Sequence, residues 1–270
     1  NWCAYAGADL AGVSRLQYPP NIRTVRVMCS GRVDPLFVLQ AFKQGCDGVL
    51  VAGWHFGDCH YLEGNVQAEK KIRLTQKLLD LAGIGEQRLH LAWVSSAEAQ
   101  RFVEVVTQTI DSVKALGKFD SKAFAFELAA AELTLAQETL RWMVGKEIKI
   151  TTKGDVFGRR WDRDRFESIL DVLLEREYQK NLILQAVKEG HTSVRDIHKK
   201  IGLDLKRISY LLADMENRNI VEFVGMKESK PIFAALWGVA NEGWRFYLMN
   251  QSAIQHLKSS KNDEFVKSPI

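Results

Sequence analysis

Along the first 118 residues, short apolar runs alternate with longer segments whose apolar residues recur at helical spacing. This alternation, with short links, is typical of an α/β fold with a parallel sheet and flanking helices. Ser95 and Glu98 have capping-box spacing, which predicts a helix that begins there and ends near Leu116. The chain starts in a predicted loop, so a first strand is expected before Asn1. The other predicted strands are residues 22–28, 47–52 and 89–94, and the other predicted helices are residues 35–44 and 67–81.

The pattern changes after residue 118. Residues 119–179 predict a helical connector, with one long helix at 124–144 and another at 163–179. Residues 180–236 show three short helical signals separated by glycines, and then two alternating segments that predict a hairpin. Three helices followed by a hairpin are typical of a winged helix-turn-helix. Residues 237–270 are expected to form a C-terminal helix and a polar tail.

Charge and hydropathy narrow the classes of partner. The 37 basic and 33 acidic residues leave a net charge of +4, which is too small to favour nucleic acid or an anionic membrane. No apolar run approaches the roughly 18–20 residues that a membrane-spanning helix needs. No secretory signal is visible in the sequence. These features predict a cytoplasmic chain without a membrane partner.

All four cysteines lie within the first 60 residues, a distribution that favours a local metal or cluster site over a disulfide scaffold. Cys29 follows one predicted strand, Cys59 follows the next, and Cys3 would follow the expected first strand. Loops at the carboxyl ends of parallel strands meet at one edge of a sheet. We therefore expect Cys3, Cys29 and Cys59 to converge. Cys46 precedes a strand and is expected to be a small buried hydrophobe.

Three converging thiols point to iron chemistry. Thiolates are natural ligands of iron, and ligation by four cysteines is usual for iron–sulfur clusters. Neighbouring arginines, Arg32 among them, could offset cluster charge, and nearby aromatic rings could shield the cluster from water. Glycines in this region could present backbone N–H groups to sulfur. The aromatic candidates are Trp2, Tyr5, Tyr18 and Trp54.

Two histidines, His55 and His60, flank Cys59 and keep other metal chemistries open. Together with Cys3 and Cys59 they would satisfy the preference of zinc for four nitrogen and sulfur ligands. Mixed cysteine and histidine ligation of a Rieske-type cluster is a further alternative. No CxxC pair or standard zinc spacing is present, so each histidine is more simply interpreted as a loop residue hydrogen-bonded to the backbone.

Several segments resemble the iron–sulfur delta subunit of methyl-viologen-reducing hydrogenase. They are NWCAYAGADLAG (1–12), SRLQYPPN (14–21), RVMCSGRVDP (26–35), GDCHYLEGN (57–65) and WVSSAE from Trp93, in the same order as in that family. The resemblance covers about residues 1–117. It implies a domain that carries a 2Fe-2S cluster and binds it through Cys3, Cys29 and Cys59, with His55, His60 and Arg32 nearby.

The same resemblance implies partners for the chain. Members of the family pass electrons between a hydrogenase, or another electron-input module, and a flavin-containing protein of the heterodisulfide reductase type. No substrate chemistry is expected of this chain alone. The family has CNWC where this chain begins with NWC, and GCHPGDCHY where this chain has Trp54 and Phe56. One matching cysteine would thus precede Asn1, and another is replaced by tryptophan.

The rear part raises a rival function, a redox-sensing winged-helix regulator that binds DNA. Residues 182–236 contain nine Lys or Arg and seven Asp or Glu. A DNA footprint needs several unopposed phosphate contacts, and this balance offers few. We therefore expect protein docking or a structural role for this part, and DNA is not the expected partner. A cluster-free scaffold of the same fold is the third interpretation.

Overall fold

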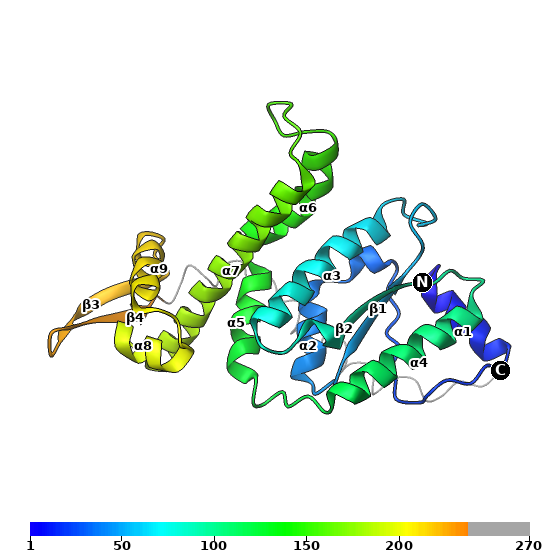
Figure 1. Cartoon of the computed structure of the whole chain (residues 1–270), viewed down its shortest axis with the longest axis horizontal. Coiled ribbons are helices and arrows are strands. Elements are labelled where there is room, and N and C mark those ends of the chain that lie inside the picture. The colour runs from blue at the N-terminus through cyan, green and yellow to red at the C-terminus, as the bar shows by residue number, and fades with distance from the viewer. Residues whose placement is uncertain (237–270) are drawn as a thin grey trace, which may run out of the picture. The chain divides into compact units, whose positions relative to one another are not determined.

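The computed structural model describes residues 1–236 (Figure 1). Contacts within the chain divide it into two compact units, Asn1–Leu182 and the part from Ile183 onward. The predicted C-terminal helix and tail at 237–270 lie outside the described residues.

The first unit is built on a small parallel sheet, as the hydrophobic pattern predicts. Strand β1 (Val49–Gly53) pairs with β2 (Leu89–Trp93), with Val49 opposite Leu89 and Gly53 opposite Trp93. Figure 1 shows α1 and α4 on one side of these strands and α2 and α3 on the other. The bounds of the helices around the sheet are α1 Ala4–Val13, α2 Pro35–Lys43, α3 Gly64–Leu81 and α4 Ala99–Leu116, with short 3₁₀ turns η1 Ser30–Arg32 and η2 Glu86–Arg88.

An apolar cluster joins α1 and α4 to the sheet. Phe102, Val106 and Ile110 of α4 are buried against small residues of α1, and Leu50 and Ala52 of β1 pack on them. Because successive strand residues point to opposite faces, the residue between these two is directed toward the face that α2 and α3 cover. The sheet is therefore covered on both faces, as parallel sheets usually are.

Two sequence predictions for the start of the chain are wrong. Residues 4–13 form helix α1, where a loop was expected, because Ala4, Gly7 and Ala11 place a stripe of small buried residues on one helical face. A side chain at position 7 would come within 2.9 Å of the Ser95 carbonyl oxygen, so glycine there permits close packing and does not signal a loop.

The predicted strand at 22–28 is also absent. These residues are extended but pair with no described strand, and Val25 is exposed. The Val27 carbonyl instead accepts a hydrogen bond from the amino terminus of Asn1 at 2.7 Å. A β-branched run makes a strand only where a neighbouring strand receives its hydrogen bonds.

The helical segment after residue 118 contains three helices, α5 (Ala125–Ala136), α6 (Glu138–Thr152) and α7 (Arg163–Lys188). The single helix predicted at 124–144 is wrong, because Gln137 is extended, with φ −64° and ψ 131°, and separates α5 from α6. Arg141 donates to the Leu135 carbonyl at 3.3 Å and satisfies an acceptor that the break leaves open.

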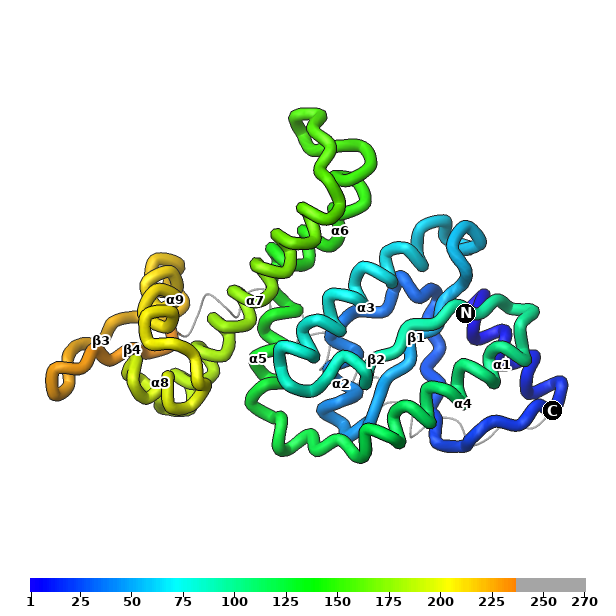
Figure 2. Tube along the Cα trace, viewed as in Figure 1, coloured from blue at the N-terminus to red at the C-terminus, as the bar shows by residue number. Residues whose placement is uncertain are grey.

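Helix α7 also differs from the prediction, which divided it into two helices. It runs without interruption for 26 residues, and Figure 2 follows it as one coil. The segment contains neither glycine nor proline, so nothing in its sequence ends the helix early. No helix within residues 1–236 is both long enough and apolar enough to cross a membrane.

A buried charge network ties α6 to α3. The Glu147 side chain is only 2% exposed, and its carboxylate accepts from Lys70 at 2.9 Å and Arg73 at 3.1 Å. A buried carboxylate is tolerated only when cations and hydrogen bonds compensate it. The helical segment is therefore joined firmly to the sheet domain.

The second unit contains α8 (Val194–Ile201), α9 (Leu205–Asn217) and an antiparallel hairpin of β3 (Val221–Lys227) and β4 (Lys230–Ala235). The predicted caps are confirmed. Ser193 accepts from the Asp196 backbone N–H, and Asp204 accepts from those of Lys206 and Arg207. The hairpin turns at Glu228 and Ser229, both with positive φ, and Gly225 lies at an irregularity in β3.

Replacing Tyr178 of α7 by phenylalanine is expected to stabilise the protein. The Tyr178 hydroxyl is buried, and among residues 1–236 it has no hydrogen-bond partner. Its removal should raise the free energy of unfolding by about 1 kcal/mol, measured by urea denaturation. Tyr178→Ala, which leaves a cavity, should lower it by about 3–5 kcal/mol. A loss of stability in the phenylalanine variant would mean that the hydroxyl has a partner.

Candidate functional site

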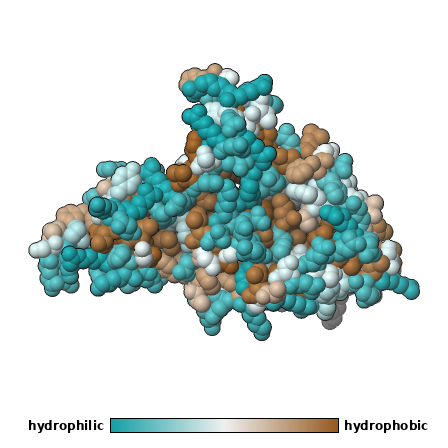
Figure 3. Space-filling view, in the orientation of Figure 1, coloured by the Kyte–Doolittle hydropathy of each residue, from teal (hydrophilic) through white to brown (hydrophobic). Residues whose placement is uncertain are grey.

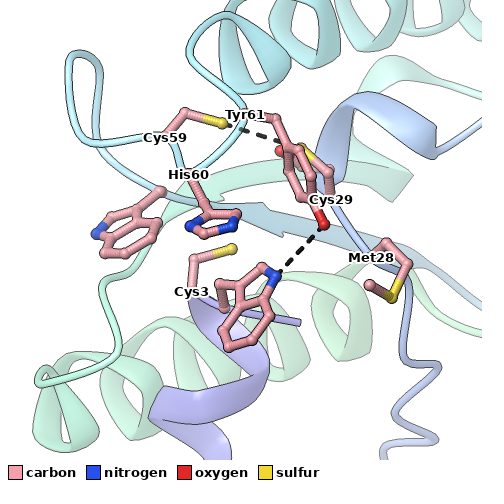
Figure 4. Close-up of a pocket in the computed structure, with 9 residues that line it drawn as sticks. Cys3, Met28, Cys29, Cys59, His60 and Tyr61 are labelled. Atoms are coloured by element: carbon pink, nitrogen blue, oxygen red, sulfur yellow. Dashed lines mark hydrogen bonds between the residues drawn. The ribbon is translucent and has the colours of Figure 1, made fainter.

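Three of the four cysteines line one pocket in the first unit (Figure 4). Their side chains come from three separate segments of the chain. Cys3 immediately precedes α1, Cys29 immediately precedes η1, and Cys59 lies in the loop between β1 and α3. The other residues that line the pocket are Trp2, Met28, Ser30, Trp54, His60 and Tyr61.

Local hydrogen bonds hold the Cys59 loop in place. Asn65, at the start of α3, is fully buried and donates from Nδ2 to the carbonyl oxygens of Trp54 at 3.0 Å and His55 at 2.6 Å. These bonds tie the two ends of the loop together. Sequence reasoning missed Asn65, although an amide directly after a glycine at a predicted helix start is a recognisable signal for a loop anchor.

The Cys29 segment is anchored from α3. Lys71 donates from Nζ to the carbonyl oxygens of Gly31 at 2.5 Å and Val33 at 2.8 Å. Asp34, which caps α2, also pairs with Arg141 of α6. The stretch of chain that contains Cys29 is therefore held by side chains of two helices, Lys71 of α3 and Arg141 of α6.

Cys29 and Cys59 form a close pair. Their Sγ atoms lie 3.9 Å apart, and the Gly31 backbone N–H donates to the Cys29 Sγ at 3.4 Å. Two thiolates bound to one tetrahedral metal at about 2.3 Å would lie about 3.8 Å apart. The spacing of the pair thus matches that of two ligands on one metal ion.

The electrostatics of the pair favour one thiolate. Burial opposes ionisation of Cys59, but the backbone N–H groups of Tyr61, Asn65 and Gly64 outweigh it and lower the pKa of this thiol. Burial raises the pKa of Cys29, and the neighbouring Cys59 raises it further. Backbone hydrogen bonds thus stabilise a thiolate at Cys59, while burial and the neighbouring sulfur oppose one at Cys29.

Gly64 makes room for both sulfurs. A Cβ atom at this position would overlap the Cys29 Sγ and lie 3.2 Å from the Cys59 Sγ. Gly31 packs directly on Gly64, since a Cβ at residue 31 would lie 2.7 Å from the Gly64 carbonyl oxygen. The two glycines allow the Cys29 segment and the start of α3 to enclose the pair of sulfurs.

The remaining predicted candidates are placed differently. Cys46 is exposed, so its expected role as a buried hydrophobe is wrong, because the turn after α2 carries it to the surface. His60 lines the pocket, and its ring lies tilted against that of Trp2, with the ring centres 5.0 Å apart. His55 is bound through Nε2 to a carboxylate oxygen of Glu98 at 2.7 Å, and not to backbone. The Arg32 guanidinium lies over the Phe37 ring.

Of the predicted shielding residues, Trp2 and Trp54 line the pocket and the two tyrosines do not. Tyr5 lies under Arg26, and Tyr18 packs edge-on against Phe102. The two tyrosines therefore belong to the surroundings of α1 and α4 and not to the wall of the pocket.

Glu98 joins the loop after β1 to the start of α4. Besides its bond to His55, its carboxylate accepts from the Ser95 backbone N–H at 2.7 Å, as a capping box requires. Helix α4 itself begins at Ala99, one residue after this glutamate. The predicted pairing of Ser95 with Glu98 is thus present, but the predicted helix start at Ser95 is wrong, because Glu98 itself is the N-cap residue of α4. The Glu98 carboxylate also binds His55.

Comparison with known proteins places this site in a family. The family model for the methyl-viologen-reducing hydrogenase delta subunit matches residues 1–117. The vhc iron-sulfur subunit of the F420-non-reducing hydrogenase of Methanococcus voltae is 48% identical over 117 residues, which are 43% of this chain and 81% of that protein. This chain belongs to the methyl-viologen-reducing hydrogenase delta subunit family. The resemblance noted in the sequence is confirmed, and residues 1–117 are called the family domain below.

Further relatives of the family domain fall into two groups. The iron-sulfur subunit of the F420-non-reducing hydrogenase of Archaeoglobus profundus is 48% identical over 119 residues, which are 44% of this chain and 87% of that protein. A subunit of the ferredoxin:CoB-CoM heterodisulfide reductase of Methanosarcina mazei is 44% identical over 122 residues, 45% of this chain but only 15% of that protein. The family domain thus also occurs as one segment of a much longer chain.

The residues of the family domain suit a metal–thiolate group in three respects. The Cys29 and Cys59 sulfurs have the spacing of two ligands, backbone N–H groups face them, and Gly64 leaves space at their side. Cys3 and Trp54 line the same pocket. Within residues 1–236, no three or more Cys, His, Asp or Glu side chains are already grouped closely enough to hold a metal ion.

Proposed function

We propose that this chain is an iron–sulfur electron-transfer protein that binds a 2Fe-2S cluster. In this proposal it relays electrons between a hydrogenase, or another electron-input module, and a flavin-containing partner of the heterodisulfide reductase type. The observation that carries the proposal is the Cys29–Cys59 pair, 3.9 Å apart, in a pocket that Cys3 also lines. Relatives named as iron-sulfur subunits share the domain that contains these cysteines.

The chain's own residues would bind and tune the cluster. Cys3, Cys29 and Cys59 would supply thiolate ligands, and the cluster, when bound, supplies one-electron chemistry. Backbone N–H groups, such as that of Gly31, would stabilise the negative charge on sulfur. His60 would lie beside the ligands. No bond is made or broken on a substrate by this chain alone.

The aromatic wall of the pocket would limit water and meet a partner. Trp2 donates from Nε1 to the Tyr61 hydroxyl at 3.4 Å and contacts the His60 ring, and Tyr61 meets His60 edge-on, so the three rings pack together in the wall of the pocket. Met28, which also lines the pocket, and Leu62 are exposed. An exposed apolar rim around a redox group suits docking of another protein.

The test is anaerobic purification of the chain, followed by iron, sulfide and absorbance measurements. We expect about two iron and two sulfide ions per chain, and a visible absorption that bleaches reversibly with a reductant. The bleached protein should reduce a purified flavoprotein of the heterodisulfide reductase type. Zinc in place of iron would favour the alternative metal chemistry, and a protein without metal would favour the scaffold interpretation.

We further propose a four-part organisation. Residues 1–118 would form the electron-transfer domain, 119–179 a helical connector, 180–236 a winged-helix-like domain, and 237–270 a C-terminal extension. The order of α8, α9 and the β3–β4 hairpin supports the winged-helix assignment.

The alternative function is a redox-sensing regulator that binds DNA through this winged-helix-like domain. Opposed charges on its surface disfavour that function, since Lys200 pairs with Glu189 and Arg218 pairs with Asp214. Sequence-selective binding to duplex DNA that weakens steeply with salt would favour it over electron transfer.

A further inference from the structure

The loop between α6 and α7, residues 153–162, is a compact structure and is called the tip loop here. Asp155 organises it. Its carboxylate accepts from the backbone N–H groups of Phe157 at 2.9 Å and Arg159 at 3.0 Å, and from the Arg159 side chain at 2.9 Å. The Trp161 indole N–H reaches the same carboxylate at 3.4 Å. Four donors on one carboxylate hold the loop in a single shape.

Backbone contacts close the tip loop further. The Asp155 N–H donates to the Arg159 carbonyl at 2.9 Å, and the Gly158 N–H donates to the Asp155 carbonyl at 3.0 Å. Burial opposes ionisation of Asp155, but the hydrogen bonds from Arg159 and Phe157 lower the pKa of this carboxyl to about 2. The loop therefore keeps its shape at any physiological pH.

This ordered loop presents apolar side chains to solvent. Val156 is 93% exposed and Phe157 is 76% exposed. The Arg159 guanidinium lies 4.9 Å from the centre of the Phe157 ring and supports it from one side. Figure 3 shows apolar surface at the free end of the α6–α7 hairpin beside hydrophilic surface. This end of the hairpin is rich in exposed cations, with two exposed acids, Asp162 and Asp164, among them. The exposed cations are Lys149, Lys153, Arg159, Arg160, Arg163 and Arg165.

We propose that the tip loop is a docking element that inserts Val156 and Phe157 into an apolar pocket rimmed by carboxylates on a flavoprotein of the heterodisulfide reductase type. An aromatic anchor inside a rim of charges is the usual form of an interface hot spot. A loop held by four hydrogen bonds loses little conformational entropy on binding, which favours such a role. The surrounding cations call for acidic groups on the partner.

This inference rests on the proposed function for the identity of the partner, and two arguments connect the loop to that partner. The tip loop lies outside residues 1–117, so any contact that it makes would be additional to those of the family domain. In the Methanosarcina mazei relative the family domain is one segment of the reductase chain itself, and a separate chain needs a surface contact to reach the same association. The ion pairs of Glu147 in α6 with Lys70 and Arg73 in α3 hold the base of the loop in a defined place beside the family domain.

The experiment measures binding of the purified full chain to the purified flavoprotein by biolayer interferometry. The double variant Val156→Ser with Phe157→Ser should raise Kd about tenfold or more. Asp155→Ala, which keeps both apolar side chains but releases the loop, should also raise it severalfold. Arg160→Glu should weaken binding most at low salt. Val172→Ser, a change at an exposed apolar residue within α7, is the matched control and should leave Kd unchanged.

Results that differ from these expectations distinguish failure of the docking proposal from failure of the proposed partner. Binding of wild type and all tip variants with one Kd would overturn the docking proposal and leave the electron-transfer function intact. Absence of any binding by the wild type, under conditions in which it carries its cluster, would overturn the partner and the docking proposal together. Tip-dependent binding to vesicles of anionic phospholipid, without binding to the flavoprotein, would make the loop a membrane contact and overturn the proposal. Circular dichroism and thermal melting of each variant confirm that the fold is retained.

Discussion

Cys29→Ser and Cys59→Ser are each expected to remove the iron from the anaerobically purified protein. The two sulfurs have the spacing of ligands on one metal ion, and only the thiolate form is an effective ligand. A serine hydroxyl does not ionise near neutral pH, so it does not replace the thiolate. The remaining cysteine would then lack the second sulfur ligand of the pair. Iron per chain should fall at least about tenfold in each variant, because even changes to groups that only orient the ligands cost about 10–100-fold in metal affinity. The visible absorption should fall in parallel.

Cys46→Ser is the matched control, because it removes a thiol that is exposed and does not line the pocket. Its iron content and absorption should equal those of the wild type. Cys3→Ser then tests the third thiol, which shares the pocket but is not part of the close pair. Unchanged iron in both Cys29→Ser and Cys59→Ser would refute the ligand assignment, whatever Cys3→Ser shows.

Gly64→Ala is expected to be nearly as damaging to iron binding, although it removes no ligand. The new methyl group would overlap the Cys29 Sγ and crowd the Cys59 Sγ. Gly64 is the first residue of α3 and has an ordinary backbone conformation, so an alanine there is opposed only by these contacts. The Cys29 sulfur or the start of α3 would have to move to relieve the overlap, which should disturb the spacing of the two sulfurs. Iron content should fall about tenfold, and crowding should lower the free energy of unfolding by about 1–3 kcal/mol.

Gly12→Ala provides the comparison. This glycine lies in α1, and nothing is within 4 Å of the position that its Cβ would occupy. The substitution should retain iron and raise the free energy of unfolding by about 0.5–1 kcal/mol, because alanine favours the helix. Measuring iron and urea denaturation for both variants separates a local effect on the sulfurs from a general effect of glycine replacement. If the iron content and the free energy of unfolding of Gly64→Ala equalled those of the wild type, the pocket would have to shift enough to accept the methyl group beside the two sulfurs.

Much of the fold is predictable because it depends on local pattern. The strands at β1 and β2, the end of α4 at Leu116 and the caps at Ser193 and Asp204 all follow from hydrophobic spacing and capping residues. Prediction failed where a neighbour far along the chain decides the structure. Residues 22–28 have the composition of a strand but no strand beside them, and Gly7 marks a close helix contact where a loop was expected.

By itself, the amino-acid sequence determined the family, the α/β class of the first domain and the three cysteines that share a pocket. The family follows from motif order, and the α/β class follows from the hydrophobic pattern. The shared pocket of the three cysteines was predicted correctly, but partly from a strand at 22–28 that the structure lacks. The tertiary structure decided which two thiols are close, that Gly64 makes room for them, and that Glu98 holds His55. It also decided that Cys46 lies at the surface and that Asp155 shapes the tip loop. The physical reason is that distances between side chains from separate segments depend on packing, and packing is not encoded in any local pattern.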